Sequence, residues 1–169
     1  LSKYNLDLIG NFTLNIYNSH SIESLKEYGL SSFTVSTELD KIEINNIINN
    51  SNLKSEVIVY GKLPVMTNNY CYLGKSNKCY ERCDKKCKLE NIYYLKDRMN
   101  FNFRIIPDNT STITTIYNSK ILSVVINDIN VDSIRIDILD EKPSEVQNII
   151  NIVKSGKRFE GKDYTNGNF

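Results

Sequence analysis

All four cysteines of this 169-residue chain lie in one stretch, which reads CYLGKSNKCYERCDKKC. They are Cys71, Cys79, Cys83 and Cys87, separated by seven, three and three residues. One turn of helix between each of the last three would place their thiols on one face. Thiolates are soft ligands that select zinc or an iron–sulfur cluster over magnesium or calcium. The stretch therefore predicts a metal site with these four cysteines as ligands.

The spacing favours iron and sulfide over zinc. Structural zinc sites usually contain pairs of cysteines separated by two residues, and the stretch has no such pair. A four-iron four-sulfur cluster takes four cysteines and tolerates more varied spacing. Zinc remains the alternative, as do four unligated thiols or two disulfides formed on oxidation.

Positive charge is concentrated in the same stretch. From Lys75 to Lys88, one residue past the stretch, the charged residues are Lys75, Lys78, Glu81, Arg82, Asp84, Lys85, Lys86 and Lys88. This charge would help to offset that of a thiolate-bound cluster, and it would attract phosphates or RNA. A solvated charged loop is the simpler interpretation. The net charge of the whole chain is only +1, and it favours no class of partner.

Length and composition predict one soluble domain over residues 1–169. No apolar run is long enough to span a bilayer, and the start has no signal-peptide pattern. We therefore expect no membrane contact and a reducing, cytoplasmic compartment, in which clustered thiols bind metal more often than they form disulfides.

Alternating strand and helix patterns surround the cysteines. Strands are expected at 11–18, 32–36, 56–62 and 133–139, and helices at 21–28, 39–49 and 143–154. Residues 92–96 and 101–106 form the two arms of a predicted hairpin, 108–115 is polar and irregular, and 121–126 is either a strand or a short helix. We expect the tail 157–169 to be mobile unless it docks. Consecutive strand–helix units predict an α/β fold with a parallel sheet.

Other polar residues are weaker candidates, and none identifies a catalytic group. His20, Glu38 and Arg98 are candidates for substrate binding, although helix capping, helix charge and turn contacts, respectively, are the simpler interpretations. Arg135 and Asp137 alternate on one strand face, so they point into a barrel mouth or pair with neighbours. Because His20 is the single histidine, a triad with Ser36, Ser119 or Ser123 has little support, and a cysteine protease using His20 is a weak alternative.

Several motifs in order resemble those of peptidase family U-32, the collagenase-like group, and most closely its clostridial type. They are GKLPVM (61–66), the cysteine stretch, YYLKDRM (93–99), IYNSKILS (116–123) and YTNG (164–167). The resemblance covers nearly the whole chain. It implies the later strands of a TIM-like barrel, interrupted by a Cys-rich loop and hairpin, and a cysteine-ligated four-iron four-sulfur cluster.

The resemblance leaves three functions open. They are a peptidase, an oxygen-independent factor that hydroxylates RNA or a small molecule, and a non-catalytic remnant stapled by metal. Cys71 and Cys79 match family cysteines, as does either Cys83 or Cys87. The family usually has a further cysteine around 108–115, and this chain has none there. A partial barrel would also expose strand edges, which predicts self-association or contact with a missing N-terminal half.

Overall fold

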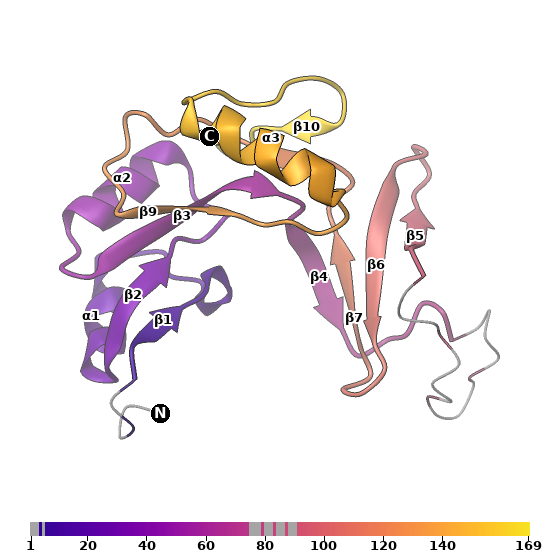
Figure 1. The fold of residues 1–169 in the computed structure, drawn as a ribbon. Coiled ribbons are helices and arrows are strands. Elements are labelled where there is room, and N and C mark those ends of the chain that lie inside the picture. Colours follow the sequence, from indigo (N-terminus) through magenta and orange to yellow (C-terminus); the bar gives the residue numbers. More distant parts are fainter. Residues whose placement is uncertain (1–3, 5, 75–78, 80–82, 84–86, 88–90) are drawn as a thin grey trace. The chain divides into compact units, whose positions relative to one another are not determined.

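The computed structural model describes residues 4, 6–74, 79, 83, 87 and 91–169 (Figure 1). The chain divides into two compact units. The first contains Leu1–Gly61 and Leu122–Phe169, and the second is Lys62–Ile121. All four cysteines therefore belong to the second unit.

The first unit contains four parallel strands, which lie side by side in the order in which they occur along the chain. They are β1 (Leu8–Gly10), β2 (Leu30–Thr34), β3 (Lys54–Gly61) and β9 (Ser133–Ile136), and each pairs with the next. The helices α1 (Ser19–Glu27) and α2 (Lys41–Asn49) connect the first three strands, and α3 (Pro143–Lys154) follows β9. β8 (Ile121–Ser123) pairs antiparallel with the end of β3, and β10 (Tyr164–Thr165) extends the sheet beyond β8. The predicted α/β alternation and the parallel pairing are confirmed.

Local sequence sets where the helices begin. Asp40 accepts a hydrogen bond from the Glu43 N–H and the Glu43 carboxylate accepts one from the Asp40 N–H, both at 2.9 Å. This capping box starts α2 at Lys41, two residues later than the pattern of apolar residues alone predicts. Pro143 begins α3, where its missing N–H costs no hydrogen bond.

The two faces of the parallel sheet differ in chemistry. Phe33 and Val57 are buried, and so are Ile22 of α1 and Ile44 of α2. Successive strand residues point to opposite faces, so the neighbours of those buried side chains form a second face, which is polar where Thr34 lies beside Glu56. One face of the parallel sheet therefore packs in the apolar core, and the other face makes polar contacts.

The predicted strand over residues 11–18 is wrong. The strand is β1, which ends at Gly10, and residues Phe12–Leu14 form a short 3-10 helix. The Asn11 side chain accepts a hydrogen bond from the Phe12 N–H, and Asn15 has a φ of 51°. These local turn contacts outweigh the alternating apolar pattern.

The second unit is an antiparallel sheet of four strands. Its spatial order is β4 (Pro64–Asn68), β7 (Ile113–Tyr117), β6 (Asn102–Asp108) and β5 (Tyr93–Lys96). The predicted hairpin is confirmed as β5–β6. The strands β4 and β7 were not expected, because β4 contains Pro64 and β7 follows a polar turn. Pro64 is tolerated because β4 is an edge strand.

Neither sheet closes into a barrel within the described ranges. The fold is therefore mixed α/β. Across the same residues, no helix has the length and apolar character needed to cross a membrane.

Candidate functional site

The cysteine stretch follows β4 directly and opens with a tight turn. The Gly74 N–H donates to the Cys71 carbonyl at 3.1 Å, and the Cys79 N–H donates to the Gly74 carbonyl at 2.8 Å. A Cβ at Gly74 would lie 3.2 Å from the Cys71 carbonyl oxygen. The small residue therefore lets the backbone fold closely between the first two cysteines.

A hairpin tip supports the other end of the stretch. The Asn109 side-chain amide donates to the Cys87 sulfur at 3.9 Å. The tip is shaped by Asp108, whose carboxylate accepts hydrogen bonds from the N–H groups of Thr110 at 2.8 Å and Ser111 at 3.2 Å. These backbone donors lower the pKa of Asp108 below its ordinary value. The β6–β7 turn thus brings an amide donor to a candidate metal ligand.

The four cysteines supply the donor atoms of an iron–sulfur cluster, but their described positions do not bring them together. All four cysteines are half-buried, and all four are thiols without a disulfide. Among the described residues, no three His, Cys, Asp or Glu side chains gather closely enough to hold a metal ion. The expected helix through the last three cysteines, and the basic residues between them, lie outside the described residues. The thiols are therefore half-buried in one loop but are not gathered as a metal would hold them.

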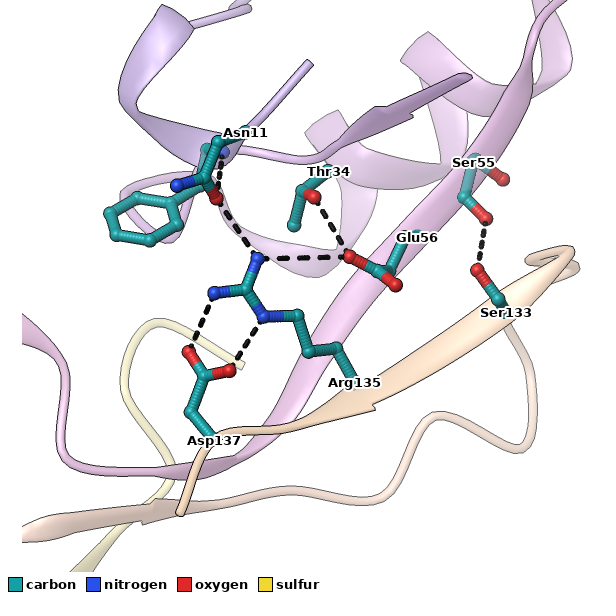
Figure 2. Close-up of polar contacts among 8 residues, drawn as sticks. Asn11, Thr34, Ser55, Glu56, Ser133, Arg135 and Asp137 are labelled. Atoms are coloured by element: carbon teal, nitrogen blue, oxygen red, sulfur yellow. Dashed lines mark hydrogen bonds and ion pairs between the residues drawn. The ribbon is translucent and has the colours of Figure 1, made fainter. Parts of the chain in front are cut away.

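A second polar cluster joins the carboxyl ends of β1, β2 and β9 to the first half of β3, and we call it the strand-end cluster (Figure 2). It consists of Asn11, Thr34, Glu56, Arg135 and Asp137. The Arg135 guanidinium forms a two-point ion pair with Asp137, through Nε at 2.6 Å and Nη2 at 3.1 Å. Arg135 Nη1 donates to Asn11 at 2.9 Å and lies 3.9 Å from Glu56 Oε1.

The strand-end cluster combines proton acceptors with a positive charge. The hydroxyl of Thr34 donates to Glu56 Oε1 at 2.8 Å and so fixes the position of that carboxylate. The side chains of Arg135, Asp137 and Glu56 are 30%, 29% and 27% exposed, so solvent reaches them. The Phe12 ring centroid lies 5.9 Å from the guanidinium carbon. Carboxylates held in this way are suited to acid–base chemistry or to binding a polar group.

Neither His20 nor Glu38 takes part in the strand-end cluster contacts given above, and Arg98 belongs to the second unit. His20 is exposed in the first turn of α1. Glu38 is exposed, and its carboxylate accepts the Tyr17 hydroxyl at 2.5 Å, which raises the pKa of Tyr17. Arg98 is exposed in the β5–β6 turn of the second unit, where Asp97 accepts the Met99 and Phe101 N–H groups. Asp97 therefore shapes the turn in which Arg98 lies.

The three serines considered for a catalytic triad are buried or half-buried. Ser36 and Ser123 are buried, and the Ser123 hydroxyl accepts the Phe159 N–H at 2.8 Å. Ser119 is half-buried in the second unit.

Sequence analysis identified Arg135 and Asp137 but missed three members of the strand-end cluster. Asn11, Thr34 and Glu56 come from three other segments, and only the strand register brings them together. One signal was available, because Glu56 is the one acidic residue of a strand whose following residues are apolar. A carboxylate in such a position needs a partner on its own face.

Comparisons with known proteins agree with the sequence motifs. The model of one family, described as Peptidase family U32, matches residues 2–159. No curated protein and no solved structure matches the chain.

Proposed function

Because the chain belongs to peptidase family U32, we propose that it is a collagenase-like peptidase domain whose cysteine stretch binds a four-iron four-sulfur cluster. The observation that carries this proposal is the set of four half-buried thiols in one loop. The ligands would be Cys71, Cys79, Cys83 and Cys87. Such a cluster supplies electron transfer or a Lewis-acidic iron when it is bound.

The order of the parallel strands supports a partial TIM-like barrel. The parallel order β1, β2, β3 and β9, with a helix after β1, β2 and β9, resembles the arrangement within such barrels, although the second unit follows β3 in place of a helix. Substrates of barrel enzymes bind at the carboxyl ends of the strands, which is where Asn11, Thr34 and Asp137 of the strand-end cluster lie. We propose that β1, an edge strand here, pairs with further strands or with a second copy. Sedimentation analysis of the purified chain would detect self-association.

Glu56 is the residue that we expect to accept a proton during hydrolysis. Its carboxylate is held by Thr34 and remains partly open to solvent. The substitution Glu56→Gln keeps the hydrogen bond from Thr34 but removes the base, so cleavage of a quenched gelatin peptide should fall about 100-fold or more. Glu23→Gln, on the exposed surface of α1, is the matched control. Unchanged cleavage in Glu56→Gln would exclude Glu56 as the base.

The alternative within the same family is oxygen-independent hydroxylation of RNA or of a small molecule, and the basic charge of the cysteine stretch favours RNA. Binding of transfer RNA that weakens steeply with salt, together with no gelatin cleavage, would favour this alternative. Gelatin cleavage without RNA binding would favour the peptidase.

Anaerobic purification followed by visible absorption, iron and sulfide analysis tests the cluster. We expect a broad band near about 400 nm that is lost in Cys79→Ser and Cys83→Ser. Tyr70→Ser changes an exposed neighbour of Cys71 without removing a thiol, and it should keep the band. Stoichiometric zinc without colour would make the loop a structural zinc site, and no metal at all would leave a non-catalytic remnant.

A further inference from the structure

The Arg135 guanidinium is firmly held, yet it keeps hydrogen-bond donors for a further group. A guanidinium carries five N–H donors. Three of them are used, because Nε and Nη2 each donate to Asp137 and Nη1 donates to Asn11 Oδ1. Among the described residues, the second N–H of Nη1 and that of Nη2 have no acceptor within hydrogen-bond distance.

One of these unused donors lies beside Glu56. Arg135 Nη1 is 3.9 Å from Glu56 Oε1, which is too long for a hydrogen bond, so the carboxylate does not occupy the donor. Figure 2 shows the guanidinium between the carboxylates of Glu56 and Asp137. A base and a donor this close together are able to act on the two oxygen atoms of one hydrolytic step, the attacking water and the carbonyl oxygen.

We propose that Arg135 stabilises the oxyanion that forms during hydrolysis of a peptide bond, and that Asp137 positions Arg135 for this task. The inference rests on the proposed peptidase function with Glu56 as its base. Glu56 removes one proton from a water molecule, whose oxygen forms a bond to the carbonyl carbon. The π electron pair of the carbonyl moves onto its oxygen, which accepts a hydrogen bond from Arg135 Nη1. When the C=O bond forms again, the C–N bond breaks and the proton passes from Glu56 to the leaving nitrogen.

The contacts of Arg135 suit this role because they fix the donor before the reaction begins. Asp137 holds the guanidinium at 2.6 Å and 3.1 Å, Asn11 holds it at 2.9 Å, and the Phe12 ring centroid lies 5.9 Å from its carbon. Donors that are already in place need no reorganisation when negative charge develops. Glu56 loses its charge as the carbonyl oxygen gains one, so Arg135 faces the same total negative charge throughout the step.

Cleavage kinetics of a quenched gelatin peptide separate substrate binding from the chemical step. Arg135→Gln should lower kcat about 100-fold and keep KM within about threefold, because the donor acts only in the transition state. Asp137→Asn weakens the two-point pair and should lower kcat about tenfold with KM unchanged. Arg158→Gln is the matched control, since it breaks the ion pair with Glu160 in the same unit and should leave both constants unchanged.

A gelatin peptide with a phosphinate in place of the scissile amide supplies a second measurement. The phosphinate is a tetrahedral anion that resembles the oxyanion, so its dissociation constant should rise by the same factor by which kcat/KM falls in each variant. Arg135→Lys keeps the charge without the fork of donors, and its affinity for the phosphinate should lie between those of the unaltered protein and Arg135→Gln. Circular dichroism verifies that each variant is folded. If Arg135→Gln unfolds, Arg135→Lys and Asp137→Asn are judged by the same criteria.

Each result decides the inference. Lower kcat and weaker phosphinate binding in Arg135→Gln, with Arg158→Gln unchanged, would support it. Cleavage by the unaltered protein with an equal kcat in Arg135→Gln would overturn the inference and leave the proposed function intact. A rise in KM alone would also overturn it, because Arg135 would then bind the substrate before the reaction. No cleavage by the unaltered protein would overturn the proposed function and, with it, the inference.

Discussion

Arg135 is the one positive charge of the strand-end cluster, beside the two carboxylates of Glu56 and Asp137. It pairs at two points with Asp137 and lies near Glu56, and all three side chains are about 30% exposed. A double-mutant cycle of Arg135→Ala and Asp137→Ala should give a coupling energy of about 1 kcal/mol, between the values for surface and buried pairs. Urea unfolding of the four proteins measures it. Additive losses would show that the pair does not stabilise the fold.

Because the pKa of Asp132 is lowered in the folded protein, we expect the fold to lose stability in acid when this carboxylate is protonated. Its carboxylate accepts hydrogen bonds from the Ser55 N–H at 2.8 Å and hydroxyl at 3.1 Å, and the backbone bond is the main cause of its lowered pKa. The stabilisation is complete above the ordinary pKa of 3.8 and is lost as the pH falls through the lower value of the folded state.

The midpoint of urea unfolding as a function of pH measures this loss. Asp132→Asn should lower the midpoint at neutral pH and flatten its decline below about pH 4. Asp163→Asn, which changes an exposed carboxylate, should keep the decline of the unaltered protein. An equally steep decline in Asp132→Asn would assign the acid sensitivity to other carboxylates.

At the scale of the elements, Gly61 allows β3 and β9 to come close together. It ends β3 with a φ of 137°, and a Cβ there would lie 2.5 Å from the Asp137 carbonyl oxygen. Gly61→Ala should therefore destabilise the fold by about 3 kcal/mol, since it adds a backbone clash to conformational strain.

Gly161 supplies the control for this prediction. Its φ is 126°, and no atom lies within 4 Å of an added Cβ. Gly161→Ala carries conformational strain without a clash, so thermal unfolding should show a clearly smaller loss than in Gly61→Ala. Equal losses would mean that the approach of Asp137 contributes nothing.

The elements that the sequence predicted are those with strong local signals. Helix α3 has Pro143 at its start and an apolar stripe, and its predicted and observed bounds agree. Strand β7 contains two threonines and follows a polar turn, so only pairing with β4 and β6 defines it. Tertiary pairing decided the strands for which local propensity was weak.

At the scale of the whole molecule, the two candidate sites differ in how far a sequence reveals them. The cysteines lie close together in the chain, so their spacing alone predicts the donor set. Arg135 and Asn11 are 124 positions apart, and no local pattern connects them. The parallel order of β1, β2, β3 and β9 brings them into contact, so that site required the register of the sheet.

The division of the chain into two units predicts which part of the protein would lose stability if the proposed cluster were removed. All four cysteines and Asn109 belong to Lys62–Ile121, whereas the strand-end cluster belongs to the first unit. Removing iron anaerobically with a chelator should therefore speed amide hydrogen exchange in β4 and β7 and leave β2 and β3 unchanged. Mass spectrometry of peptides from both units measures this difference.

Cys79→Ser, which lacks one ligand from the outset, should show the faster exchange without chelator. Equal acceleration in both units would mean that their stabilities are coupled rather than separate. Unchanged exchange in β4 and β7 would mean that a cluster bound by the cysteine stretch does not stabilise the second unit. Its role would then be limited to the reaction.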